Sequence, residues 1–121
     1  MDPTIQTTEF GSITVADEVF DHDVVIGLDH KVRKRKKKLS KREYGTSHKV
    51  SLEEAKDLFE KGAKRLLIGS GQYGNVELSP EAKEYFEKKD CSVTLLPTPE
   101  AIQAWNELKG DSTIGMFHVT C

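Results

Sequence analysis

The chain has 121 residues and a mass of 13.6 kDa, a length that fits one domain spanning 1–121. Hydrophobic residues make up 36% and charged residues 31%, and the mean hydropathy of -0.53 is typical of a soluble globular protein rather than of a membrane or disordered one. The net charge of -2 excludes a global attraction to nucleic acid or anionic membranes.

The start of the chain, MDPTIQTTEFGS, has neither the basic nor the apolar region of a signal peptide. No apolar run approaches the ~20 residues of a spanning helix. The two cysteines, Cys91 and Cys121, are too few for a disulfide framework of the kind found in small secreted domains. We therefore expect a cytoplasmic protein with no membrane association and with reduced thiols.

Residues 10–34 consist of short β-rich runs separated by Asp, Glu, Gly and His, a pattern that predicts an antiparallel meander. The clearest strand is 23–28, whose continuous apolar run of Val24, Val25 and Ile26 predicts burial on both faces. Val32 stands among cations, so a strand there is expected at an exposed sheet edge.

Helical patterns follow. The segments 40–43 and 51–54 both read S-x-x-E, which predicts a capping box at a helix start. We expect the first to open a single turn that Gly45 stops, and the second to open a longer helix that Gly62 ends. The apolar face of this longer helix consists of Leu52, Ala55, Leu58 and Phe59.

The second half alternates strands and helices. Strands are predicted at 65–68, 92–96 and 114–119. The motifs Ser79-Pro80-Glu81 and Thr98-Pro99-Glu100 each predict a helix start, and Gly110 is expected to end the last helix. This alternation predicts an α/β domain with a largely parallel sheet covered by helices.

Residues 69–74 match G-x-G-x-x-G directly after a strand, the weak fingerprint of a dinucleotide-binding turn. A genuine fingerprint needs a helix that begins within the glycine turn and a carboxylate after the next strand. Here the helix begins only at Ser79-Pro80, and the next strand ends in Leu96-Pro97-Thr98. We therefore predict no cofactor and interpret the glycines as residues of a tight loop with positive φ angles.

The segment 31–42 holds nine of the eighteen basic residues. No aromatic residue is interleaved with the cations to stack on bases, so we favour a solvated arm over a nucleic-acid site. Weak, sequence-independent binding of anions or nucleic acid remains open, with these candidates: Arg33, Lys34, Arg35, Lys36, Lys37, Lys38, Lys41 and Arg42.

The four histidines and two cysteines match no zinc-site spacing, and we predict no metal. Along an extended strand, His118 and Cys121 point to opposite faces. A catalytic Cys-His pair that uses His48 remains open.

Several motifs together resemble the Mth938-like domain family. They are Tyr44-Gly45-Thr46-Ser47-His48, Ile68-Gly69-Ser70-Gly71, Leu96-Pro97-Thr98, the helix 100–106 with Trp105-Asn106, and the closing Phe117-His118-Val119-Thr120-Cys121. The likeness covers nearly the whole chain, from Phe10-Gly11 onward. It implies a single three-layer α/β domain around a mixed sheet with one antiparallel strand, added to the N-terminal meander. It implies no catalytic residue or cofactor, and its better-described relatives act in assembly or regulation.

Two functional hypotheses follow. The first is a non-enzymatic binding, assembly or regulatory module with a protein partner. The second is a small enzyme or ligand-binding protein that uses a cleft at the carboxyl ends of the parallel strands. The absence of an obvious general base favours the first. The candidate surface consists of His48, Gly69, Ser70, Gly71, Gln72, Tyr73, Thr98, His118 and Cys121.

Overall fold

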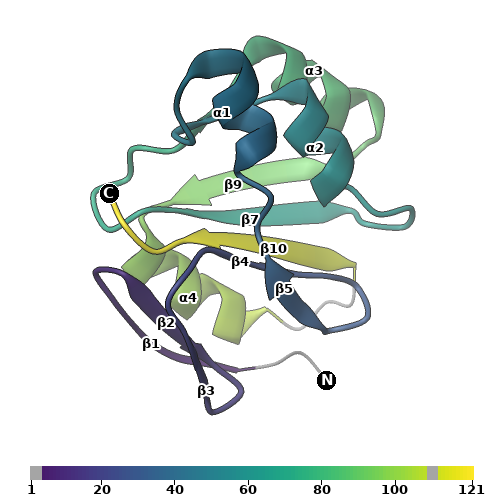
Figure 1. The fold of residues 1–121 in the computed structure, drawn as a ribbon. Helices are drawn as coiled ribbons and strands as arrows, with labels where there is room; N and C mark the ends of the chain where they lie inside the picture. The colour runs from purple at the N-terminus through teal and green to yellow at the C-terminus, as the bar shows by residue number, and fades with distance from the viewer. Residues whose placement is uncertain (1–3, 109–111) are drawn as a thin grey trace.

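A five-stranded mixed sheet forms the middle of three layers in the computed structural model, which describes residues 4–108 and 112–121 (Figure 1). Its strands, in spatial order, are β5 (Val32–Lys34), β4 (Val24–Ile26), β10 (Thr113–His118), β7 (Arg65–Ser70) and β9 (Ser92–Leu96). Only β4 runs antiparallel to its neighbours within this sheet, since β10, β7 and β9 are parallel and β5 pairs antiparallel with β4. The predicted α/β fold with one antiparallel strand is confirmed, and β5 lies at an edge as expected.

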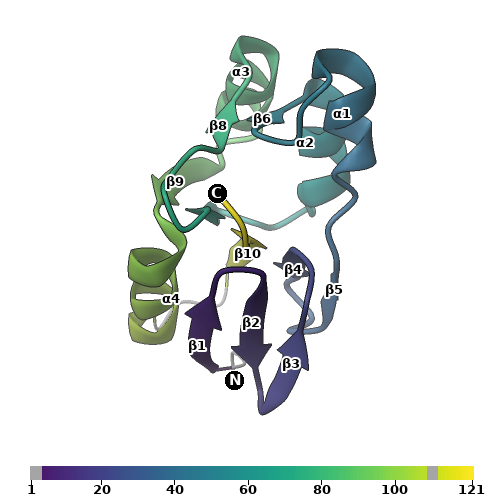
Figure 2. The same ribbon diagram turned by 60° about the vertical axis from the view of Figure 1, so that its left-hand side comes forward.

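One face of this sheet is covered by three helices (Figures 1 and 2). They are α1 (Lys38–Tyr44), α2 (Leu52–Leu58) and α3 (Pro80–Lys88), joined by a short parallel pair of strands, β6 (Lys49–Val50) and β8 (Glu77–Leu78). The apolar cluster beneath them includes Leu58, Phe86, Ile68 and Met116. Its burial of large side chains is the main stabilising contribution of this layer.

The opposite face carries α4 (Thr98–Glu107) and a separate antiparallel sheet of β1 (Ile5–Glu9), β2 (Ser12–Val15) and β3 (Glu18–Phe20) (Figure 2). Trp105 packs edge-to-face on Phe117 with ring centroids 5.8 Å apart. The Asn106 side chain bonds both the N–H and the carbonyl of Ile5, fixing β1 to α4. The predicted meander is therefore present, but β4 and β5 belong to the central sheet.

Two helix starts follow the sequence prediction. Ser79 accepts a hydrogen bond from the Ala82 N–H with Pro80 in the first turn, and Ser51 accepts one from the Glu54 N–H. Ser40 departs from it, because this serine lies inside α1 and is fully buried rather than capping the helix. Its hydroxyl instead donates to the Glu54 carboxylate, so the first S-x-x-E is not a capping box.

Helix ends were predicted less well. Gly45 ends α1 in the left-handed conformation, as expected, with a φ of 71°. Helix α2, however, ends at Leu58, and Gly62 lies in the turn that follows. The extended backbone of Phe59 stops the helix earlier, since the Phe59 side chain packs against the apolar cluster beneath α2 and α3. The predicted stop at Gly110 lies outside the described residues.

Strand β7 reaches Ser70, so Gly69 is a strand residue, whereas Gly71 and Gly74 have positive φ values of 104° and 73°. Strand β8 then intervenes before α3 begins. The interpretation as a tight loop thus holds for Gly71 and Gly74. Gly69 is glycine for a different reason, because a Cβ there would lie 2.9 Å from the Phe117 ring and 3.0 Å from Thr98 Oγ1.

We predict that Gly71→Ala destabilises the protein by more than Gly45→Ala. Both positions have positive φ, which costs an alanine about 1–2 kcal/mol. At Gly45 an added Cβ meets nothing within 4 Å, while at Gly71 it would lie 2.5 Å from the Cys121 carbonyl oxygen. Urea unfolding of the two variants measures the difference, and equal losses of unfolding free energy would contradict the close approach.

Candidate functional site

The loop after β7 and the C-terminal segment lie side by side at one edge of the central sheet. The Gln72 N–H donates to the Thr120 carbonyl at 2.7 Å, and the Asn75 N–H donates to the Cys121 carbonyl at 3.3 Å. The β1–β2 turn joins them, because the Gln72 side chain donates to Thr8 Oγ1 at 3.0 Å and the Gly11 N–H donates to the Val119 carbonyl at 2.7 Å. Three distant parts of the sequence therefore form one surface.

The buried Thr98 side chain connects the loop after β7 to the end of β10. The Gly71 N–H donates to Thr98 Oγ1 at 2.9 Å, and the same hydroxyl donates to the His118 carbonyl at 2.6 Å. Thr98 is also the first residue of α4. Pro97 occupies the capping position, without a side-chain hydrogen bond. The threonine oxygen that we expected at a helix cap instead connects the ends of three elements.

The nine residues of the candidate surface differ in accessibility. Gly69, Ser70, Gly71, Thr98 and His118 are buried, whereas His48, Gln72 and Cys121 are half-buried and Tyr73 is 73% exposed. The buried residues can shape the surface but cannot contact a partner directly. Direct contact is open only to His48, Gln72, Tyr73 and Cys121 of this set.

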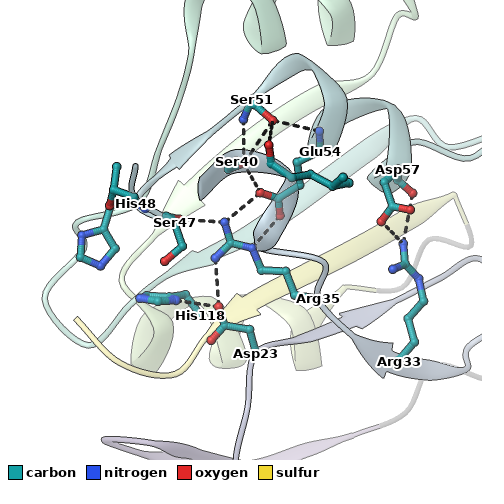
Figure 3. Close-up of polar contacts among 12 residues, drawn as sticks. Asp23, Arg33, Arg35, Ser40, Ser47, His48, Ser51, Glu54, Asp57 and His118 are labelled. Carbon is teal, nitrogen blue, oxygen red and sulfur yellow. Dashed lines mark hydrogen bonds and ion pairs between the residues drawn. The ribbon is translucent and has the colours of Figure 1, made fainter. Parts of the chain in front are cut away.

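His118 is the polar centre of the site. Its Nδ1 lies 2.7 Å from Asp23 Oδ2 (Figure 3). Its Nε2 lies 3.1 Å from Thr120 Oγ1. The His48 ring packs edge-to-face on it with centroids 5.3 Å apart. Asp23 reaches this position because β4 is antiparallel to β10 and Val24 pairs with Phe117, so the residue before Val24 lies beside His118, the last residue of β10. Its Oδ1 accepts the Val119 N–H at 2.9 Å.

Arg35 lies at the centre of the buried polar network (Figure 3). Its guanidinium donates to both Glu54 oxygens at 2.6 and 2.9 Å, to Asp23 Oδ2 at 2.9 Å and to the Ser47 carbonyl at 2.8 Å. Arg35 is 3% exposed and Glu54 is fully buried. Our assignment of Arg35 to an anion-binding surface is therefore wrong, because its donors are occupied inside the protein.

The other basic residues of 31–42 lie in or next to β5 and α1 rather than in a separate arm. Arg33 and Lys36 both pair with Asp57, at 3.0 and 3.5 Å. The exposed cations Lys37, Lys38, Lys41 and Arg42 lie at or in α1, and the exposed Lys34 is the last residue of β5. Weak anion binding by these residues stays a prediction.

The pKa values follow from this packing. Burial alone would raise the pKa of Asp23, but the hydrogen bond and charge of His118, the Val119 N–H and the Arg35 charge lower it to about 2. Burial alone would lower the pKa of Arg35, and the hydrogen bonds and charges of Glu54 and Asp23 raise it instead. Burial raises the pKa of the Cys91 thiol, which makes this cysteine a poor nucleophile.

A depression of about 470 Å³ borders the site and is lined by Tyr44, Thr46, His48, Lys49, Asn75 and Glu77. His48 therefore faces both this depression and the His118 ring. Within 4–108 and 112–121, no group of three His, Cys, Asp or Glu side chains is placed to hold a metal ion. Over the same ranges, no helix is long and apolar enough to cross a membrane.

Sequence reasoning missed Asp23 and Glu54, and it assigned Arg35 to the wrong environment. The available signal was weak: Asp23 directly precedes a strand of three buried residues, and Glu54 follows the buried Ser51 at helical spacing. An acidic residue at either place is ordinarily solvent-exposed. Only the tertiary pairing shows that both carboxylates have one common partner.

We predict that Arg35→Lys lowers the unfolding free energy by about 3 kcal/mol or more, since a single ammonium group cannot satisfy two carboxylates and a carbonyl inside the protein. Arg33→Lys is the matched control and should cost less than about 1 kcal/mol, because Arg33 is 41% exposed in a surface ion pair. Urea unfolding at neutral pH compares them, and similar losses would contradict a special role for Arg35.

Asp23 also predicts a dependence of stability on pH. Because its pKa falls from 3.8 to about 2 on folding, the stabilisation is complete above pH 5 and is lost as pH falls from 4 through 2. The expected contribution is roughly 2 kcal/mol. Urea unfolding between pH 2 and 6 tests this. The change of unfolding free energy with pH should be smaller in Asp23→Asn than in the wild-type protein. It should be unchanged in Asp21→Asn, a variant of an exposed residue.

Comparisons with known proteins agree with this architecture. Residues 5–118 match the family described as a protein of unknown function (DUF498/DUF598). The fold is similar to that of a conserved hypothetical protein, PH1505, from Pyrococcus horikoshii OT3, with 37% identity, a TM-score of 0.91 and coverage of 98% of this chain and 99% of that one. It is also similar to MT938, with 34% identity, a TM-score of 0.83 and coverage of 99% and 100%.

A more distant match is a protein from Bordetella pertussis whose solution structure is described as a Mth938-like domain. The identity is 16%, the TM-score 0.66, and the match covers 97% of this chain and 85% of that one, so it supports the fold alone. The family match and the two relatives above 30% identity are decisive. This chain therefore belongs to the DUF498/DUF598 family and has the fold of the Mth938-like domains.

Proposed function

We propose that this protein is a binding module that recognises a protein partner through two projecting aromatic side chains. Phe10, in the β1–β2 turn, is 62% exposed, and Tyr73, in the loop after β7, is 73% exposed. Their ring centroids lie 6.4 Å apart. This exposed pair, from segments more than sixty residues apart in sequence, is the observation that carries the proposal.

The backbone beneath the pair is held in place. Gln72, next to Tyr73, donates through its side chain to Thr8 Oγ1 and to the Glu9 carbonyl. Gly11, next to Phe10, donates to Val119 of the C-terminal segment. Binding thus orders only the aromatic side chains and not the loops that carry them, which lowers the entropic cost of association.

The chemistry of the pair fits a protein better than a small ligand. Small-molecule sites are concave and bury most of their ligand, whereas these rings project from two loops. Tyrosine is enriched among the side chains that dominate binding energy, where a partner's pocket encloses an aromatic ring. We therefore propose a folded partner with a shallow apolar recess, into which Phe10 and Tyr73 insert.

We predict that Phe10→Ser combined with Tyr73→Ser weakens partner binding at least tenfold, or by about 1.4 kcal/mol. The control is Val19→Ser, which removes an equally exposed apolar side chain (67%) from β3. Partners retained by the immobilised wild-type protein are identified by quantitative mass spectrometry, and their affinities for all three proteins are then measured with purified components.

Thermal unfolding should show the double variant folded, because both rings are largely exposed. Equal affinity of wild type and double variant for every retained partner would contradict the proposal. Sedimentation of the isolated protein measures its oligomeric state. If the wild-type protein is a dimer and the double substitution makes it a monomer, the partner is a second copy of this chain rather than a different protein.

A further inference from the structure

We propose that Asp23, His118 and Thr120 form a nucleophilic triad for acyl transfer, an activity that goes beyond the binding role and does not depend on it. The three side chains form one chain of contacts, with 2.7 Å from Asp23 Oδ2 to His118 Nδ1 and 3.1 Å from His118 Nε2 to Thr120 Oγ1. Carboxylate, imidazole and hydroxyl in this order are the arrangement that activates a hydroxyl as nucleophile.

Asp23 acts as the positioning residue. It is ionised at neutral pH, and its Oδ1 is fixed by the Val119 N–H at 2.9 Å while Oδ2 faces the imidazole. A carboxylate at Nδ1 holds the proton on that nitrogen. The lone pair of Nε2 is then directed at the Thr120 hydroxyl, as required of a general base.

The charged side chains next to His118 do not balance. Arg35 contributes +1, and Glu54 and Asp23 contribute -1 each, so the buried group carries a net charge of -1 while the imidazole is neutral. A proton transferred from Thr120 to Nε2 brings the sum to zero. Because uncompensated charge inside a protein is costly, the network stabilises the imidazolium that forms as the hydroxyl attacks.

Arg35 does not cancel the effect of Asp23. Its guanidinium shares Asp23 Oδ2, but it is bound at two nitrogens by Glu54, which neutralises it. Asp23 thus keeps an acceptor for Nδ1 and a negative charge that no other cation of this network balances.

Access comes from the surface already described. Thr120 is half-buried rather than buried, and His48, packed on the His118 ring, lines the depression of about 470 Å³. Lys49 and Asn75 line the same depression, which therefore lies next to the triad on the side of His48. A hydroxyl activated by an imidazole and a carboxylate attacks acyl carbonyls, and a small carboxylic ester is the substrate class that we assign.

The chemical step balances without a further reagent. Thr120 Oγ1 attacks the ester carbonyl as its proton passes to His118 Nε2. Collapse of the tetrahedral intermediate breaks the C–O bond to the alcohol, which leaves with that proton, and the acyl group stays on Thr120. Water then attacks the acyl group as its proton passes to His118. The C–O bond to Thr120 breaks, His118 returns the proton to Thr120 Oγ1 and the carboxylic acid leaves, so that ester and water become acid and alcohol.

A fluorophosphonate tests this, because a nucleophilic hydroxyl displaces its fluoride and keeps the phosphonyl group. We expect a single adduct on Thr120 of the folded protein, found by peptide mass spectrometry. Thr120→Val should lower the labelling rate at least tenfold, and Thr120→Ser should restore labelling at the same position. Thr94→Val, the same substitution on the exposed part of β9, should label like wild type.

Three results would overturn the triad. They are absence of an adduct on the folded wild-type protein, an adduct at any other residue in place of Thr120, and an unchanged rate in Thr120→Val. Labelling of Thr120 that is equally fast in protein unfolded by urea would also overturn it, because the reactivity would then not come from His118 and Asp23. Circular dichroism of each variant confirms that the comparison is made between folded proteins.

Discussion

The buried guanidinium of Arg35 is the constraint on which one edge of the molecule depends. Arg35 directly follows β5, and its guanidinium reaches α2, where Glu54, Asp23 and the Ser47 carbonyl occupy its donors. These acceptors belong to a helix, to the residue before β4 and to the segment before β6. Removing a single partner would leave a charge buried without compensation, which is far costlier than losing an exposed ion pair. The network therefore fixes the relative positions of elements that apolar packing alone would allow to slide.

Asp23 connects the buried Arg35 network to the candidate site, because it contacts both Arg35 and His118. The one antiparallel strand of the central sheet begins where the parallel strands β10 and β7 end, so Asp23 meets His118 and Val119 there. Thr98 completes the connection by bonding the His118 carbonyl and the Gly71 N–H. In α/β sheets, ligands bind at the carboxyl ends of parallel strands. Here the C-terminal segment lies at that edge and accepts hydrogen bonds from the loop after β7.

Much of the fold could be predicted from local patterns. The apolar run 24–26 predicted a strand buried on both faces, and its side chains do enter both apolar clusters. Ser79-Pro80 and Ser51 predicted helix starts because capping depends on neighbouring residues only. Ser40 shows where such reasoning fails. The same S-x-x-E pattern lies within a helix there, since the Ser40 hydroxyl bonds the side chain of Glu54, fourteen residues away.

The sequence predicted which segments form the candidate surface, but it did not predict the buried charged residues beneath that surface. The glycine loop and the C-terminal motif are each a continuous stretch of sequence, so each could be recognised as a motif, and the resemblance to a family indicated that they belong to one surface. Arg35 was indistinguishable from eight other basic residues of 31–42, because only the pairing of β5 with β4 and the packing of α2 decide which of them is buried. The alternation of side chains along β5 buries neither Arg33 nor Lys34, and the chain turns toward α1 at the next residue. Charge density along a sequence thus identifies a basic segment. It does not identify Arg35, the cation that is buried and whose donors bond to protein acceptors instead of water.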